Sequence, residues 1–203
     1  MKILTYIFDI IFPPRNTDVL LRTVVAGDIK NKFLPQHIDN TTCLSVYHEP
    51  LIRALITENK YHKNKHATKY LSTLLKEWLA TRTTPIVLLP IPLSLKRHRE
   101  RGHNQVTIVL EALHKDESVC IDTTSLKRSR HTIAQTTLGR GERLSNLTGA
   151  FICDAEKIQS YQNCTLVIVD DVFTTGATMT AAHAALAPHL HPTSTLLCLA
   201  LAH

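Results

Sequence analysis

The sequence predicts an α/β protein in which helices flank a central, mostly parallel sheet. Leu166–Val169 is an uninterrupted, mostly β-branched apolar run, as expected for a strand that is covered on both faces. An acidic pair, a threonine-rich turn and an alanine-rich helical segment follow it, which is the order of a strand that ends at a ligand site. The chain has 203 residues, of which 44% are hydrophobic, enough for one core.

The first 45 residues are expected to form a helix and a connector. Residues 1–14 combine an apolar run with Asp9 and end in two prolines, which predicts a short amphipathic helix that docks on or caps the rest. Insertion at a membrane surface is the alternative for this helix. Residues 15–45 show weak periodicity and indicate a connector with one short strand near Cys43–Tyr47. The main domain is therefore placed at residues 46–203.

Two helices are expected next, because apolar residues recur at helical spacing from Leu51 to Ile56 and from Ala67 to Trp78. The basic residues between and beside them, Lys60, Lys63 and Lys65, belong either to a solvated turn or to a phosphate contact.

The second half of the chain continues with strands and helices. The remaining expected elements are a core strand within 85–92 that prolines end, a helix over 105–114, a short strand at 119–121, a helix over 177–190 and a last buried strand over 195–201.

A phosphosugar site is predicted at the end of the central strand. Asp170 and Asp171 lie where open α/β sheets place their ligands, and ionised carboxylates accept hydrogen bonds from sugar hydroxyls. The turn from Thr174 to Thr178 leads into a helix, whose first N–H groups and dipole favour a phosphate. Gly176 lets the backbone approach the ligand closely. A solvated strand end with a helix cap is the alternative, but the order of all four parts favours the site.

These residues resemble a known motif. The segment LVIVDDVFTTGAT from Leu166 is similar to the motif of type I phosphoribosyltransferases that binds 5-phosphoribosyl-1-pyrophosphate (PRPP). The segments LLPIPLSLKRHRERGHNQ from Leu88 and LKRSRHTIAQTTLGRGERLSNLTGAF from Leu126 look like the ComF family of phosphoribosyltransferase-like proteins, which is associated with competence and DNA uptake. The resemblance covers residues 46–203 and implies a type I phosphoribosyltransferase fold with a flexible loop over the site.

The chain departs from the family pattern at two places. Many members begin with a cysteine-rich zinc segment, whereas the region before Val46 contains only Cys43, so no zinc finger is expected there. His103 stands where phenylalanine is usual, which keeps a planar ring and adds a hydrogen-bonding group.

The resemblance assigns a role to each group of site residues. Arginine suits such a ligand because it binds phosphate in bidentate geometry, although each basic residue taken singly also fits an exposed surface. The assigned residues are Asp170 and Asp171 as catalytic; Thr174, Thr175, Gly176, Ala177 and Thr178 for the 5-phosphate; Lys96, Arg97, Arg99 and Arg101 in a pyrophosphate loop; and Arg128, Arg130, Thr132, Gln135 and Arg143 in the flexible loop within 126–146.

The resemblance implies a Mg²⁺-assisted enzyme that transfers a phosphoribosyl group from PRPP to an unidentified acceptor. No side chain is expected to bind Mg²⁺ directly; the ion is expected near Asp170 and Asp171 through PRPP and water. Thr174 stands where purine-salvage relatives commonly have aspartate, which disfavours hypoxanthine and guanine as acceptors. Amidophosphoribosyl transfer is disfavoured too, because the chain has no room for the glutaminase domain that would deliver ammonia.

The alternative is a non-catalytic protein of competence that senses PRPP or handles single-stranded DNA. The net charge of +6 fits either a polyphosphate or a nucleic acid, while 5% aromatic residues provide few surfaces on which bases can stack. The candidate partners are PRPP, single-stranded DNA, a competence helicase and a second copy of the chain. The five cysteines show no paired spacing and no membrane span is expected, which favours a reduced, cytoplasmic protein.

Overall fold

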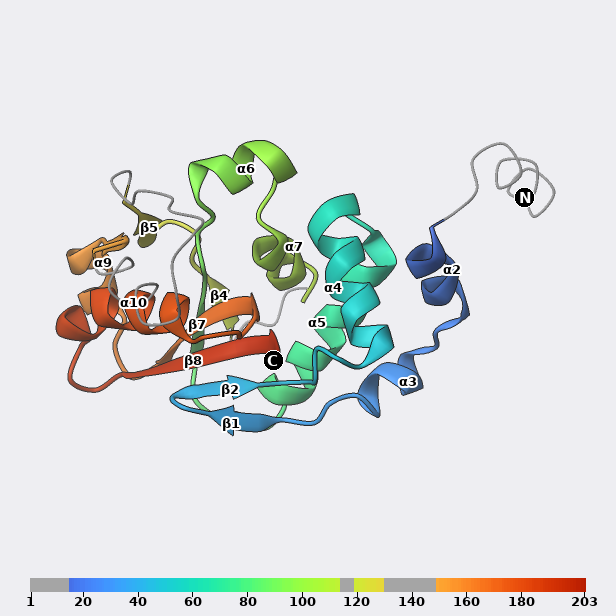
Figure 1. Ribbon diagram of the computed structural model, residues 1–203. Helices are drawn as coiled ribbons and strands as arrows, with labels where there is room; N and C mark the ends of the chain where they lie inside the picture. Colours follow the sequence, from blue (N-terminus) through green and yellow to red (C-terminus); the bar gives the residue numbers. More distant parts are fainter. Residues whose placement is uncertain (1–14, 114–118, 130–148) are drawn as a thin grey trace.

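A six-stranded sheet forms the centre of the computed structural model, which describes residues 15–113, 119–129 and 149–203 (Figure 1). Its strand order is β1-β2-β8-β7-β3-β4, and all neighbours pair in parallel except β1 and β2. The strands are β1 (Gln36–Ile38), β2 (Thr41–Cys43), β3 (Ile86–Pro90), β4 (Val119–Ile121), β7 (Thr165–Val172) and β8 (Thr195–Ala202). The predicted fold class, a mostly parallel sheet between helices, is confirmed.

Helices cover both faces of this sheet. On one face lie α4 (Pro50–His62), α5 (Lys65–Leu79) and α7 (Gln105–Glu111), and on the other lie α9 (Ala155–Ser160) and α10 (Ala177–Leu186). Successive residues of β7 alternate between the two sides: Val167 and Val169 belong to the first core cluster, and Leu166 and Ile168 belong to the second. Burial on both faces therefore explains why the strand is apolar without interruption.

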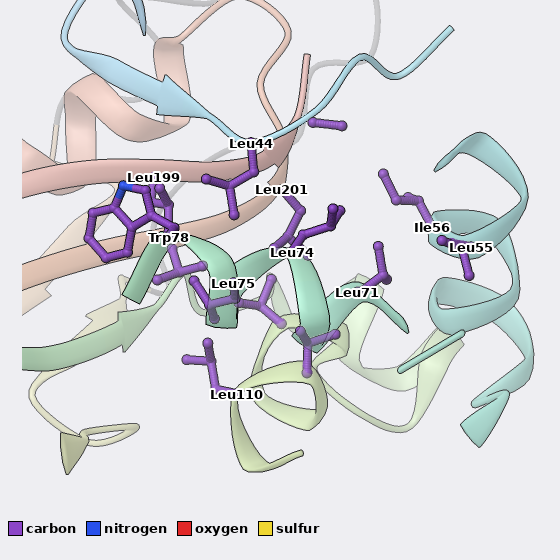
Figure 2. Packing of buried hydrophobic residues seen from close by; sticks show 14 of the residues in the cluster. Leu44, Leu55, Ile56, Leu71, Leu74, Leu75, Trp78, Leu110, Leu199 and Leu201 are labelled. Atoms are coloured by element: carbon purple, nitrogen blue, oxygen red, sulfur yellow. The ribbon is translucent and has the colours of Figure 1, made fainter. Parts of the chain in front are cut away.

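The first core cluster joins the helices to the last strand. Figure 2 shows Trp78 and leucines of α5 against Leu199 and Leu201 of β8, with Leu110 of α7 nearby. This packing holds the carboxyl ends of the central strands in a fixed position relative to α4, α5 and α7.

Residues 15–45 contain the one predicted short strand, as β2, but the prediction that the rest is a connector is wrong. The segment forms α2 (Asn16–Thr23) and α3 (Ala26–Lys30) before β1 and β2, and Leu21 and Ile29 are core residues. Its contacts are made with distant residues such as Glu58, which local periodicity does not reveal. The division at residue 45 stays a prediction, although β2 belongs to the same sheet as β8.

The segment predicted as a flap begins with a strand. β5 (Leu126–Arg128) pairs antiparallel with β6 (Phe151–Cys153). Residues 130–146 of the predicted flap, and the predicted helix over residues 1–14, lie outside the described residues. In the part of the chain that the structure describes, we find no helix with the length and apolar character needed to cross a membrane.

Candidate functional site

A cavity of about 510 Å³ opens at the carboxyl ends of the parallel strands. We call it the site cavity. Its walls come from the ends of β3, β7 and β8 and from the segment after β2. The helices α4, α6 (Leu95–Arg101), α7 and α10 and the strand β5 complete them. The lining residues are Tyr47, His48, Lys60, Ile91, Pro92, Leu93, Arg97, Gln105, Arg128, Asp170, Asp171, Val172, Phe173, Thr174, Thr178 and His203.

Both predicted carboxylates line the site cavity, but their environments differ. Asp171 is 7% exposed, and its Oδ2 lies 2.9 Å from Lys60 Nζ and accepts a hydrogen bond from Gln105 Nε2. Asp170 is half-buried and accepts the backbone N–H of Asp171. Burial raises the pKa of Asp170, and the charge of Asp171 raises it further, whereas Lys60 and Arg97 act in the opposite direction. Asp170 therefore takes up a proton more readily than an ordinary aspartate.

The predicted phosphate turn has the form that anion binding needs. Gly176 has a φ of 75° and precedes α10, a helix that no side chain caps. The first N–H groups of α10 are therefore free of a capping side chain. A Cβ at Gly176 would lie 2.9 Å from the Phe173 ring, so the position also requires the absence of a side chain. Thr174 and Thr178 line the site cavity, whereas Thr175, Gly176 and Ala177 contribute the backbone of the turn.

The predicted pyrophosphate loop is a helix, α6 (Leu95–Arg101), and only Arg97 of its four basic candidates lines the site cavity. Successive residues of a helix point about 100° apart, so four basic side chains within one short helix cannot all face one ligand. The other three do not line it. Lys96 Nζ lies 4.0 Å from Glu100 Oε1, Arg99 is exposed, and the guanidinium of Arg101 lies over the Tyr61 ring.

Arg128 is the one flexible-loop candidate among the described residues. It ends β5, lies over the Phe151 ring and lines the site cavity. Burial lowers its pKa, with a second contribution from Arg97, and its Nε has no hydrogen-bond partner among the described residues. The other candidates, Arg130, Thr132, Gln135 and Arg143, lie outside those residues.

Several residues of the site cavity were not selected from the sequence. Tyr47, His48 and His203 follow β2 or end β8, and the shared edge of parallel strands would have indicated them once the strand order was known. Gln105 lies within the motif quoted for the family resemblance but received no role. Its Oε1 is buried and has no hydrogen-bond partner among the described residues.

His103, the departure from the family pattern, lies outside the site cavity and connects two neighbouring elements. Its Nδ1 lies 2.7 Å from the carbonyl oxygen of Arg101, and its Nε2 lies 3.1 Å from that of Asn59. A neutral imidazole has one N–H and can donate to one of these two carbonyl oxygens, at the end of α6 or in the last turn of α4, whereas a phenylalanine could donate to neither.

Asp170 and Asp171 are the acidic side chains of the site cavity that could hold a divalent ion. The described residues contain no group of three or more histidine, cysteine, aspartate or glutamate side chains that could hold a metal. Asp170 and Asp171 still provide the carboxylate oxygens that Mg²⁺ prefers.

No family model matches the chain. Competence protein F of Haemophilus influenzae is 30% identical over 149 residues, which are 70% of this chain and 63% of that protein. DNA utilization protein YhgH of Escherichia coli K12 is 33% identical over 136 residues, which are 64% of this chain and 58% of that protein. The chain is a homologue of the ComF-family competence proteins. Competence protein ComFC of Bacillus subtilis is 32% identical over 94 residues, which are 46% of this chain and 35% of that protein.

These matches confirm the relationship to ComF expected from the motifs. This ComF homologue spans only 63% and 58% of the first two relatives, so their activities as whole proteins do not transfer directly. A hypoxanthine phosphoribosyltransferase from Staphylococcus aureus is a structural neighbour at 15% identity and a TM-score of 0.38, covering 65% of this chain and 61% of that one. We draw no conclusion from a likeness of this size.

Proposed function

We propose that this ComF homologue binds PRPP in the site cavity and transfers its phosphoribosyl group to a small acceptor. The observation that carries the proposal is the meeting of an acidic pair, a phosphate turn and two arginines in one cavity. In this arrangement Asp170 and Asp171 take the ribose hydroxyls, and the turn that includes Thr174 takes the 5-phosphate. Arg97 and Arg128 take the pyrophosphate.

The proposed reaction breaks the bond between ribose C1 and the pyrophosphate oxygen and forms a bond between C1 and the acceptor nucleophile, so that pyrophosphate leaves. Positive charge develops on the sugar ring, and the two carboxylates beside it stabilise that charge. Arg97 and Arg128 stabilise the negative charge of the departing pyrophosphate. Mg²⁺, held by ligand oxygens and water near Asp170 and Asp171, would neutralise further charge on the leaving group.

The 5-phosphate turn supplies binding energy away from the reacting carbon. Its N–H groups are fixed by α10, so a phosphate held there restrains the whole sugar. Gln105 donates to Asp171 and so positions that carboxylate beside the sugar. The acceptor stays unidentified, and Thr174 still disfavours hypoxanthine and guanine.

The names of the relatives support a second candidate, a protein that senses PRPP or handles single-stranded DNA without turnover. One relative is a DNA utilization protein and others are competence proteins. The net charge of +6 and the exposed basic side chains of Lys96 and Arg99 are compatible with nucleic acid. A competence helicase as partner, a homodimer and a cytoplasmic location stay predictions.

A screen for pyrophosphate release separates the two candidates. The protein is incubated with PRPP, Mg²⁺ and one small nucleophile at a time, and pyrophosphate is measured. Transfer predicts release that depends on one acceptor and disappears in Asp170→Asn/Asp171→Asn. PRPP binding without release for any acceptor, together with single-stranded DNA binding that weakens steeply with salt, would favour the second candidate.

A further inference from the structure

Lys60 lines the site cavity. The sequence alone left two interpretations of its basic run, a solvated turn or a phosphate contact. It lies in the last turn of α4, and its side chain is 20% exposed. Lys63 and Lys65 of the same run are exposed and do not line the cavity. The fold therefore separates one lysine of the run from the other two.

The position of Lys60 is determined by buried polar neighbours. Glu58 is 0% exposed and accepts hydrogen bonds from Arg15 Nε and Nη2 at 2.9 and 2.8 Å. Asn59 is 1% exposed, and its Nδ2 donates to the carbonyl oxygen of Gln105 at 3.0 Å. These bonds fix the last turn of α4 against the start of α2 and the start of α7. The side chain of Lys60 thus begins from a rigid backbone, as a preorganised site needs.

The ammonium group of Lys60 has donors to spare. A lysine carries three N–H donors, and the described residues provide one partner, Asp171 Oδ2 at 2.9 Å. Gln105 Nε2 donates to the same oxygen. Lys60 can therefore keep its contact with Asp171 and still donate two hydrogen bonds to a ligand.

Lys60 also decides the charge balance of the site cavity. The charged lining residues are Lys60, Arg97, Arg128, Asp170 and Asp171. Among the described residues, and with both carboxylates ionised, the two arginines alone would only balance the two carboxylates. With Lys60 the cavity has a positive excess, which a ligand with several negative charges needs.

We propose that Lys60 is a ligand-binding residue that donates to the pyrophosphate of the bound phosphosugar while it keeps Asp171 in place. This inference rests on the proposed function. Lys60 contacts Asp171, which is assigned to the ribose hydroxyls, so its charge acts at the C1 end of the ligand. The 5-phosphate is assigned to the turn at Thr174–Thr178 and does not depend on it.

Calorimetry with two ligands tests this assignment. PRPP carries the pyrophosphate, and ribose 5-phosphate lacks it. Lys60→Gln is expected to weaken PRPP binding about tenfold, or about 1.4 kcal/mol, and ribose 5-phosphate binding by less than about threefold. Lys65→Gln, which removes the same charge outside the cavity, should change neither affinity. Lys60→Met is measured in parallel, and thermal unfolding verifies that each variant is folded.

Three results would overturn the inference while the wild-type protein binds PRPP. Unchanged PRPP affinity in Lys60→Gln would mean that Lys60 does not bind the ligand. Tighter PRPP binding by this variant would mean that Lys60 blocks the site. Equal weakening for both ligands would mean that Lys60 acts only through Asp171. A wild-type protein that does not bind PRPP at all would instead remove the proposed function, and this inference with it.

Discussion

At the scale of single residues, Asp170 and Asp171 show how neighbours in one strand come to differ. Asp171 is buried against a lysine and a glutamine, whereas Asp170 has a backbone N–H as its partner and a raised pKa. The raised pKa therefore makes the charge of Asp170 dependent on pH.

This difference predicts that PRPP binding strengthens as pH rises. The raised pKa keeps part of Asp170 protonated at lower pH, and a protonated carboxyl gives less stabilisation to ribose hydroxyls and to positive charge. Affinity measured by calorimetry from about pH 5 to about pH 8 should increase more steeply for the wild type than for Asp170→Asn. Asp170→Asn is the control, because the phosphates of PRPP titrate in the same way with both proteins. Identical pH profiles for the two proteins would refute the prediction.

Gly176 gives a prediction about the phosphate turn. Gly176→Ala places a side chain at a φ of 75° and 2.9 Å from the Phe173 ring, so thermal unfolding should show a loss of about 2 kcal/mol. Ribose 5-phosphate should also bind more weakly. Gly102→Ala is the matched control, because Gly102 has a φ of 69° with no atom within 4 Å of the added Cβ. Equal losses for both variants would show that contact with Phe173 does not matter.

The sequence predicted the residues of the central strand end better than those of the basic segment. Asp170, Asp171 and Thr174 reach the site cavity because they directly follow a strand whose position the apolar run reveals. The basic candidates lie in α6, where helical rotation sends Lys96 and Arg99 away from the cavity. Because this segment was interpreted as a loop, the sequence motif did not indicate in which direction each basic side chain points.

At the scale of elements, the last turn of α4 connects α2 to the site cavity. Glu58 binds Arg15 and Thr17 from the start of α2, and Lys60 binds Asp171 two residues later. The hydrogen bond from Arg15 is the main reason that the pKa of Glu58 is lowered to about 2. This ion pair explains why α2 is ordered although its own sequence is short and weakly periodic.

Glu58→Gln should therefore destabilise the protein by about 2 kcal/mol at neutral pH, because charged hydrogen bonds are lost at a buried position. The lowered pKa means that Glu58 contributes its full stability above its unfolded pKa and loses it as pH falls toward 2. Denaturant unfolding of wild type and variant should then converge in acid. Glu77→Gln, which breaks the more exposed pair with Lys30, should cost less than about 0.5 kcal/mol. A Glu58→Gln effect no larger than that control would contradict the prediction.

The elements that the sequence predicted well are those with strong local patterns. The helices α4, α5 and α7 and the strands β3, β7 and β8 follow from apolar periodicity and prolines. The sequence did not indicate α2, α3 and β1, because their stability comes from distant partners such as Glu58 and, for β1, from pairing with β2. The position of β2 beside β8 is likewise a property of the sheet and not of residues 41–43 alone.

At the scale of the whole molecule, the site cavity exists only because the sheet brings distant segments to one edge. Lys60, Arg97, Arg128 and Asp171 come from four separate elements, α4, α6, β5 and β7. The homologues establish the family relationship, while the cavity supplies the chemical reason to expect a phosphosugar. The central claim is therefore that this cavity binds PRPP through its two carboxylates.

Calorimetry of PRPP with Mg²⁺ tests that claim most directly. The wild-type protein should bind, and Asp170→Asn/Asp171→Asn should lose at least about tenfold in affinity, or about 1.4 kcal/mol, while remaining folded. Absence of PRPP binding by the wild type, or equal affinity in the double variant, would contradict the account.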